Sequence, residues 1–499
     1  MHQQYLLGID NGGSATKCVL FDLQGRVISN AAVRVSVHRR GGGIVERDGE
    51  DIFRQNCCVI RETIDKAQVN PADIICMGLC GYGGGLGMLD AAGDPIAPFI
   101  VSTDSRAQAV LAALQAGGAA DAAYAHTFYE PWPGQPTALL PWFRQNDPAI
   151  LSRCAHAVMI KDYIRYRLTG VIGTEFTDAS NTGLFNIHTK RFDPEVFRIF
   201  GIKEQFSCFP DKVFAPADIA GYITTQAAAQ TGLREGTPVA AGLYDAAACC
   251  LASGILDAST LCLIMGTWSI SGRLSINLPV RSEKGTAMFS FLEGWYFLEE
   301  ASPTSASNLD WFIEQFYRKM LPLGSDIYES CNQIVGKLDP AKSDLVFLPY
   351  LYGSNTISGA NGCFFNLASH HTSEDVLLAV YEGIMFSLLH HVVRLCGNAP
   401  VGRARLSGGA SRSGVWCQML ADMLDASVDL PECAELGALG GALCAGVAIG
   451  AYRDYSQAVT DMCRIRCAYM PNPERVDIYH AKYERFNKAI QTLEAFTKI

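Results

Sequence analysis

An aspartate stands between an apolar run and a glycine turn near the start of the chain. Asp10 follows the apolar residues 5–9, and the turn after it can offer backbone amides, hydroxyls and an ammonium group. These groups belong to Gly12, Gly13, Ser14, Thr16 and Lys17. A carboxylate for Mg²⁺ beside N–H groups for phosphate is what a nucleoside triphosphate requires. The alternative is a plain β-hairpin with a glycine turn, because short motifs recur by chance.

A second aspartate, Asp245, lies where an apolar strand ending at Gly242 meets an alanine-rich helix. The N-terminus of a helix stabilises a carboxylate as the anion. A carboxylate placed there can accept the proton of a hydroxyl group and so act as a general base. An aspartate that merely caps the helix would look the same in sequence.

The pattern of strand, glycine turn and strand returns about half the chain later. Residues 261–272 repeat it, with Gly266 and Thr267 in the turn, but without an acid at the position of Asp10. A repeat at this distance indicates an internal duplication. We therefore expect two related α/β domains, residues 1–248 and 249–499, with a cleft between them.

Other polar and aromatic residues lie in loops where a small ligand could bind. The buried strand 74–80 runs into a loop with five glycines, 81–87. Asp104 and Arg106 lie at a strand-to-helix junction, where ligand-facing groups are common; the alternative is a helix cap and its salt-bridge partner. Trp132, in a Pro-rich loop, could cover the C–H face of a sugar or could be a hydrophobic plug.

The last third of the chain has features that suit a nucleotide. Gly408 and Gly409 separate a strand from a helix and would let an adenine or ribose lie against the backbone. The uncharged segment 436–452 is rich in Gly and Ala and short for a membrane span. We expect it to be a tightly packed buried helix.

Composition narrows the class of protein. A chain of 499 residues should hold two or more domains, and a net charge of −10 argues against a nucleic-acid-binding surface. The 18 cysteines include no C-x-x-C pair, so we expect reduced, mostly buried thiols. Without a signal-peptide pattern or a membrane span, the expected location is the cytoplasm.

Four motifs stand in a fixed order, and together they resemble the FGGY carbohydrate kinases across the whole chain. They are Asp10–Lys17, Gly242–Ala246, Met265–Ser269 and Ser407–Gln418. The resemblance implies an α/β fold of two duplicated actin-like, ribonuclease-H-like ATPase domains flanking a central cleft. Within the family the chain is most similar to the bacterial kinases of L-xylulose and 3-keto-L-gulonate, for example through Leu351–Asn355.

The resemblance also implies an activity, in which the γ-phosphate of ATP passes to a hydroxyl of a ketopentose such as L-xylulose, or of a related sugar or polyol. Asp10 would hold Mg²⁺, and Asp245 would be the general base. The nucleotide and its phosphates would contact Asn11, Gly12, Gly13, Ser14, Thr16, Lys17, Gly266, Thr267, Asn355, Gly408, Gly409 and Ser413. The sugar would lie among Gly83, Gly84, Asp104, Arg106, Trp132, Gln135 and Asp245. A homodimer is an expected assembly, because dimers are common in the family.

The chain departs from its relatives on the sugar side. Other members carry larger side chains at the positions of Gly83 and Gly84, and tryptophans at those of Ser102 and Ile44. We therefore expect room for a larger or differently shaped polyol, and a substrate such as another polyol or a sugar acid stays open.

Two rival functions remain. A non-catalytic, actin-like ATP-binding sensor would not need a base at Asp245. A hydrolase could use Asp10 and Asp245 as a carboxylate pair, although glycine turns suited to phosphate argue against it.

Overall fold

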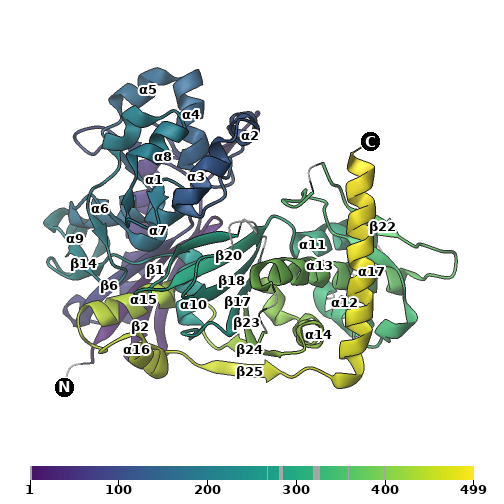
Figure 1. Cartoon of the computed structure of the whole chain (residues 1–499). Helices are drawn as coiled ribbons and strands as arrows, with labels where there is room; N and C mark the ends of the chain where they lie inside the picture. The colour runs from purple at the N-terminus through teal and green to yellow at the C-terminus, as the bar shows by residue number, and fades with distance from the viewer. Residues whose placement is uncertain are drawn as a thin grey trace. The chain divides into compact units, whose positions relative to one another are not determined.

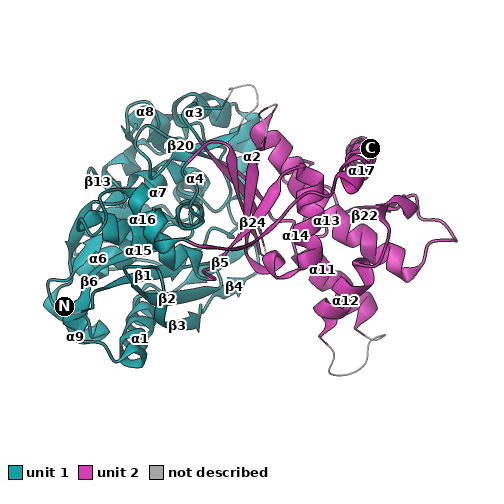
Figure 2. Ribbon diagram, turned by 90° about the horizontal axis from the view of Figure 1, so that it is seen from below, with its two compact units in different colours: residues 1–256, 275–298, 435–463 teal, residues 257–274, 299–434, 464–499 magenta. Residues whose placement is uncertain are grey.

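The chain divides into two units, each assembled from separate stretches of sequence (Figure 2). The computed structural model describes residues 3–266, 268–279, 285–318, 326–357, 359–397, 399 and 401–498. Unit 1 comprises residues 1–256, 275–298 and 435–463, and unit 2 comprises residues 257–274, 299–434 and 464–499. The domains expected from sequence, 1–248 and 249–499, are contiguous, so they differ from these units chiefly in segments 275–298 and 435–463.

Unit 1 is built around a mixed sheet with strand order β14-β15-β6-β1-β2-β3, and β16 also pairs with β6. The strands are β1 (Tyr5–Asn11), β2 (Ala15–Asp22), β3 (Val27–Arg34), β6 (Ile74–Gly81), β14 (Ile219–Tyr222), β15 (Pro238–Ala240) and β16 (Leu243–Tyr244). Strand β1 is antiparallel to β2 and parallel to β6. Leu6, Leu7 and Ile9 are fully buried, because β1 is covered on both faces.

Helix α1 (Gly49–Ala67) packs on β2 and β3, and α15 (Leu436–Ala448) packs on the central strands β1 and β6, as Figure 1 shows for α15. The close approach of α15 depends on glycines. A Cβ atom on Gly8 would lie 1.9 Å from the carbonyl oxygen of Ala438, and one on Gly78 would lie 2.0 Å from that of Gly441. Buried α15 confirms the interpretation of segment 436–452 as a packed helix for its first 13 residues, and the helix ends at Ala448.

Helix α1 begins where the sequence predicts. Asp48 is its N-cap, and the Asp48 side chain accepts a hydrogen bond from the backbone N–H of Asp51.

The remaining elements of unit 1 lie around the sheet. They are β4 (His38–Arg40), β5 (Ile44–Arg47), η1 (Pro71–Asp73), β7 (Gly87–Leu89), β8 (Phe99–Ile100), α2 (Gln108–Ala116), α3 (Ala119–Thr127), α4 (Pro136–Asn146), α5 (Pro148–Arg153), β9 (His156–Val158), α6 (Ile160–Thr169), β10 (Thr174–Glu175), α7 (Phe176–Asn181), β11 (Phe185–Asn186), β12 (Arg191–Phe192), α8 (Pro194–Ile199), η2 (Lys203–Cys208), β13 (Val213–Phe214), α9 (Thr225–Thr231), α10 (Asp245–Ala252), β19 (Thr286–Phe289) and α16 (Tyr455–Met462).

Unit 2 repeats the central pattern of unit 1. Its strands belong to a seven-stranded sheet of order β19-β20-β18-β17-β23-β24-β25, in which β17 has an antiparallel partner, β18, and a parallel one, β23. These are β17 (Thr260–Met265), β18 (Ser269–Ser275), β20 (Tyr296–Ser302), β23 (Arg403–Ser407), β24 (Ser427–Pro431) and β25 (Ile465–Tyr469). The matching pattern in the two units agrees with the duplication inferred from residues 261–272.

Long helices form much of the core of unit 2. Its other elements are α11 (Ser307–Phe312), the π-helix η4 (Ile313–Tyr317), α12 (Ile327–Val335), η5 (Pro340–Lys342), β21 (Val346–Leu348), β22 (Cys363–Phe365), α13 (Ser373–Cys396), η6 (Gly409–Arg412), α14 (Gly414–Leu424) and α17 (Pro473–Thr497). Within the described part of the chain, α13 alone is long and apolar enough to cross a membrane, and 83% of its apolar window is buried, as in a core helix.

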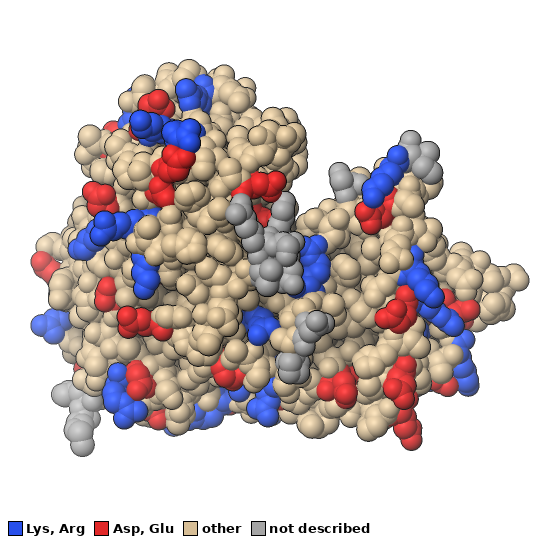
Figure 3. Space-filling model, in the orientation of Figure 1, with Lys and Arg blue, Asp and Glu red and all other residues tan. Residues whose placement is uncertain are grey.

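The surface carries both signs of charge. On the face drawn in Figure 3, Lys and Arg side chains are interspersed with Asp and Glu side chains. All 18 cysteines are free thiols, and most of them are buried.

Candidate active site

The register of the unit 1 sheet brings the residues singled out by sequence to one edge. Asp10 on β1 is the pairing partner of Lys17 on β2 and of Cys80 on β6. Cys80 in turn pairs with Leu243 on β16, two residues before Asp245. Because neighbouring strands lie ~4.8 Å apart, Leu243 is about 10 Å from Asp10. One sheet edge therefore carries Lys17, Asp10 and the start of the Asp245 helix.

The carboxylate of Asp10 lies in a tight setting. The Cys80 thiol donates to Asp10 Oδ1 at 3.4 Å. A Cβ atom on Gly437, in the first turn of α15, would lie 2.7 Å from Asp10 Oδ2 and 3.0 Å from Cys80 Sγ. Burial raises the pKa of Asp10, the positive charge of Lys17 lowers it, and the negative charge of Glu435 raises it further. Only a glycine at position 437 leaves space for the carboxylate.

Lys17 makes a salt bridge that the sequence did not predict. Its Nζ atom donates to Glu435 Oε2 at 2.6 Å, with about a third of each side chain exposed. Burial acts to lower the pKa of Lys17, but the hydrogen bond and charge of Glu435, together with the charge of Asp10, raise it overall. Glu435 was missed because nothing local marks it; the only hint is its place as the last charge before the uncharged segment 436–452.

The donor set at this edge fits Mg²⁺. Asp10 and Glu435 offer carboxylate oxygens, the ligand type that Mg²⁺ prefers, and the lack of a side chain at Gly437 lets the Asp10 carboxylate lie against the first turn of α15. Lys17 adds a cation for phosphate. The residues present therefore suit a magnesium-bound phosphate.

The hairpin between β1 and β2 contains residues of two kinds. Gly13 and Ser14 are exposed, and Gly12 N donates to Ala15 O at 3.1 Å to close the turn. Asn11 and Thr16 are buried. Thr16 Oγ1 donates to Asn11 Oδ1 at 3.3 Å, so this pair braces the hairpin from inside. The exposed turn is the part that can meet a phosphate.

Asp245 is the first residue of α10. The N-cap residue is Tyr244, so the alternative that Asp245 is the capping residue is wrong. The Tyr244 N–H donates to Thr177 Oγ1 at 2.8 Å, and that hydroxyl donates to Glu175 Oε1 at 2.6 Å. This buried chain fixes the backbone immediately before Asp245.

The loop that contains Trp132 is tied to its neighbours by its own polar groups. Trp132 Nε1 donates to the carbonyl oxygen of Ser102 at 3.0 Å. The Gln135 side chain is buried; its Oε1 accepts from Trp132 N at 3.1 Å, and its Nε2 donates to Asn181 O at 3.1 Å and to Tyr129 Oη. Gln135 thus joins the tryptophan loop to the end of α7.

Asp104 and Arg106 form the salt bridge of the second interpretation, but Asp104 does not cap a helix, because the N-cap residue of α2 is Ala107. Arg106 donates to Asp104 Oδ2 and to Glu46 Oε1, both at 2.8 Å, and Asp104 Oδ2 also accepts from Val45 N at 2.7 Å. The exposed fractions of the Asp104 and Arg106 side chains are 0% and 5%. Their polar groups serve this buried network.

The glycines at 83 and 84 do not leave the room that the sequence suggested. A Cβ atom on Gly83 would lie 2.6 Å from the ring of Tyr244 and 2.7 Å from Asn181 Oδ1. One on Gly84 would lie 3.2 Å from Gln135. The expectation of a more spacious sugar site is therefore wrong at these positions, because neighbouring residues fill the space.

Unit 2 contains a separate cavity of about 490 Å³, a size suited to a small ligand. Its lining includes Gly266, Gly409, Ser413, Tyr328, Tyr381 and Trp416. Ser413, the N-cap of α14, donates from Oγ to Asn332 Oδ1 at 2.7 Å, and Tyr381 Oη donates to the same oxygen at 3.1 Å. Asn332 therefore links two walls of the cavity.

The other described residues of unit 2 that were expected to contact the nucleotide do not line this cavity. Gly408 has φ +85°, and a Cβ atom there would lie 2.3 Å from Met265 O, so it shapes the turn beside the cavity. Asn355 is absent from the cavity lining, and its Nδ2 donates to Ala301 O at 2.6 Å. Thr267 lies outside the described residues. Of the aromatic residues that line the cavity, Trp416 lies within the motif Ser407–Gln418, whereas Tyr328 and Tyr381 lie outside the four motifs.

Known proteins resemble the chain along its whole length. Residues 5–252 match the N-terminal domain, and residues 261–449 the C-terminal domain, of the FGGY family of carbohydrate kinases. A probable L-xylulose kinase of Pasteurella multocida is 35% identical, covering 98% of this chain and 99% of that protein. An L-xylulose/3-keto-L-gulonate kinase of Escherichia coli is 34% identical, covering 99% and 98%.

The crystal structure of a ligand-bound xylulose kinase from Lactobacillus acidophilus has the same fold, with a TM-score of 0.92 at 22% identity, covering 99% of both chains. The expected two-domain, actin-like α/β fold is thereby confirmed. With both domains matched and relatives above 30% identity along the full length, the chain belongs to the FGGY family of carbohydrate kinases.

Proposed function

We propose that this sugar kinase uses ATP and Mg²⁺ to phosphorylate L-xylulose or 3-keto-L-gulonate, with Asp245 as the general base. The observation that carries the proposal is the strand register, which puts Asp10, Lys17 and the start of the Asp245 helix at one sheet edge. In this proposal a sugar hydroxyl attacks the γ-phosphorus, the bond to the ADP oxygen breaks, and the hydroxyl proton passes to Asp245.

The residues of the chain then have separate tasks. Gly13 and Ser14 are the exposed residues of the turn that meets the phosphates, and Lys17 supplies a positive charge. Asp10 would hold Mg²⁺, which when bound neutralises charge on the transferred phosphoryl group. Glu175 and Thr177 hold the backbone before Asp245. The cavity of unit 2 would take the adenosine, because it offers aromatic walls and a glycine turn.

On the sugar side the structure favours a revised set of roles. Asp104, Arg106 and Gln135 have their polar groups engaged with the protein, so we assign them to positioning the loops. Trp132 is partly exposed and remains a candidate sugar contact beside Gly83 and Asp245. The substrate class comes from the two relatives named for L-xylulose, which match along the full chain.

The test is ADP release with a panel of L-xylulose, 3-keto-L-gulonate, D-xylulose, gluconate and glycerol. We expect the first two to give the highest kcat/KM. Asp245→Asn should lower kcat by about 10²–10⁴-fold and leave ATP affinity unchanged. A strong preference for another sugar would overturn the substrate, and normal turnover by the variant would overturn the base. Hydrolysis of ATP independent of sugar would favour the sensor.

A further inference from the structure

The salt bridge between Lys17 and Glu435 stands at the edge of the sheet where phosphate is proposed to bind. Glu435 directly precedes α15, and Gly437 in the first turn of that helix lies against the Asp10 carboxylate. Lys17 pairs with Asp10 across the β1–β2 hairpin. The start of α15 therefore brings a second carboxylate to the place where Asp10 and Lys17 already lie.

Asp10 and Glu435 are the two negative charges at this point. Among the described residues, Lys17 supplies the positive charge that acts on Asp10. Two carboxylates that share a site repel each other unless a cation lies close to both. Lys17 supplies that cation: it is 2.6 Å from Glu435 Oε2, and its charge acts on Asp10. A divalent cation would do the same with twice the charge.

We propose that Glu435 is a second carboxylate of the magnesium site, and that Lys17 holds the metal's place until the metal-bound nucleotide arrives. On arrival the Lys17 ammonium leaves Glu435 for the phosphate oxygens, and Asp10 and Glu435 face the hydrated cation. The inference rests on the proposed function, since it assumes that the nucleotide's metal binds at Asp10.

Two physical properties make this exchange feasible. The pair is partly exposed, with exposed fractions of 34% for Lys17 and 30% for Glu435, and such pairs contribute little to stability. Lys17 therefore leaves its partner at small cost. Phosphate oxygens are strong acceptors that attract a lysine ammonium, and Mg²⁺ keeps several waters, so carboxylates can hold it through hydrogen bonds to those waters.

The test measures Mn²⁺ binding to the full chain, without nucleotide, by the electron paramagnetic resonance signal of free Mn²⁺. Glu435→Gln should weaken binding about tenfold, because it removes one negative charge. Lys17→Met should tighten binding several-fold, because it removes the competing cation. The two changes act in opposite directions, which a loss of folding would not produce, and thermal melts check the fold of each variant.

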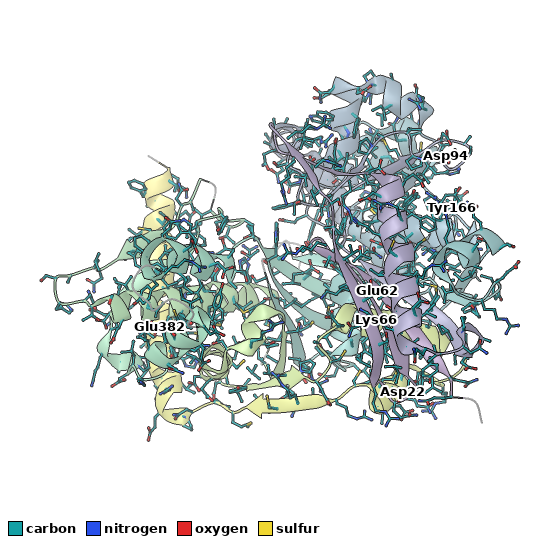
Figure 4. All side chains as sticks on the ribbon, turned by 180° about the vertical axis from the view of Figure 1, so that it is seen from behind. Asp22, Glu62, Lys66, Asp94, Tyr166 and Glu382 are labelled. Carbon is teal, nitrogen blue, oxygen red and sulfur yellow. The ribbon has the colours of Figure 1, made fainter. Side chains whose placement is uncertain are left out.

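The matched control is Glu62→Gln. Glu62 pairs with Lys66 at 2.7 Å on α1, with both side chains about half exposed, and both are labelled in Figure 4. This change removes the same charge from a salt bridge outside the proposed site, so Mn²⁺ affinity should stay at the wild-type value.

Asp10→Asn separates the inference from the proposed function. If Asp10→Asn weakens binding and Glu435→Gln does not, the role of Glu435 is wrong and the metal site at Asp10 stands. If neither variant changes the affinity, the metal is not held at this edge, and both fail. Weaker binding by Lys17→Met would overturn the place-holding role of the lysine.

Discussion

Replacing Gly437 by alanine should displace the carboxylate of Asp10 while the fold persists. The added Cβ atom would lie 2.7 Å from Asp10 Cγ and Oδ2, whereas ordinary contacts begin at 3.4 Å. The carboxylate must therefore retreat by about 0.7 Å, and a side chain can do this more easily than backbone. A misplacement of ~1 Å at a reacting centre can lower the rate by about 10²-fold.

For Gly437→Ala we expect kcat/KM for phosphorylation to fall by about 10–100-fold, which corresponds to ~1.4–2.7 kcal/mol of transition-state stabilisation. Mn²⁺ affinity should fall as well. The free energy of unfolding should change by no more than about 1 kcal/mol, because only the partly buried side chain of Asp10, near the end of β1, has to move and alanine is the better helix former. Steady-state kinetics, metal titration and urea unfolding measure the three quantities.

Gly441→Ala, one turn further along α15, is the matched control. Its Cβ atom would lie 3.0 Å from the backbone C and O atoms of Gly78, which cannot swing away. We expect a loss of ~1–3 kcal/mol of stability from overpacking, partly offset by helix propensity, with Mn²⁺ affinity unchanged. The reasoning is refuted if Gly437→Ala retains kcat/KM within twofold of the wild type, or if Gly441→Ala lowers metal affinity equally.

Three further changes test other parts of the structure. Thr177→Val leaves the buried N–H of Tyr244 without its acceptor, at a cost of ~1–3 kcal/mol. We expect kcat to fall by at least about tenfold with KM for ATP unchanged, and Thr177→Ser to restore kcat. Asn332→Ala removes the acceptor that joins two walls of the unit 2 cavity, so KM for ATP should rise about tenfold while KM for the sugar stays constant. Burial raises the pKa of Glu382 from 4.5 to about 7 against the opposing charge of Lys482, so the native state holds this proton more tightly than the unfolded chain. The protonated Glu382 side chain contributes fully to stability below pH 4.5, and this contribution is lost as the pH rises to 7, by at most ~1.4 kcal/mol per pH unit. Glu382→Gln should reduce the difference in the free energy of unfolding between pH 5 and pH 7, measured from unfolding curves.

The parts of the fold that depend on local patterns could be predicted from sequence. The hairpin after Asp10, the capped helix after Asp48 and the helix that begins at Asp245 all appear in the structure. In each case, apolar runs, glycines and capping residues lie within a few positions of one another. The order of four such motifs was enough to indicate the family, which the full-length matches confirm.

The parts of the site that depend on distant contacts could not be predicted. Glu435 lies 418 positions from its partner Lys17, and no pattern near either residue links them. The space at Gly83 is taken by Tyr244 and Asn181, which are also far away in sequence. A glycine at a position where relatives carry a larger residue therefore does not indicate free volume in the site, because neighbouring elements pack into the space that the side chain would take.

The return of residues 435–463 to unit 1 affects how the protein folds during synthesis. The strands of the unit 1 sheet leave the ribosome early, but α15, which covers β1 and β6, comes after about 180 further residues, ~10–40 s later at ordinary rates. Until then the glycine-lined face of these strands has no helix on it. The nascent N-terminal half therefore needs protection from aggregation, and a chain that stops before Glu435 would keep that face exposed.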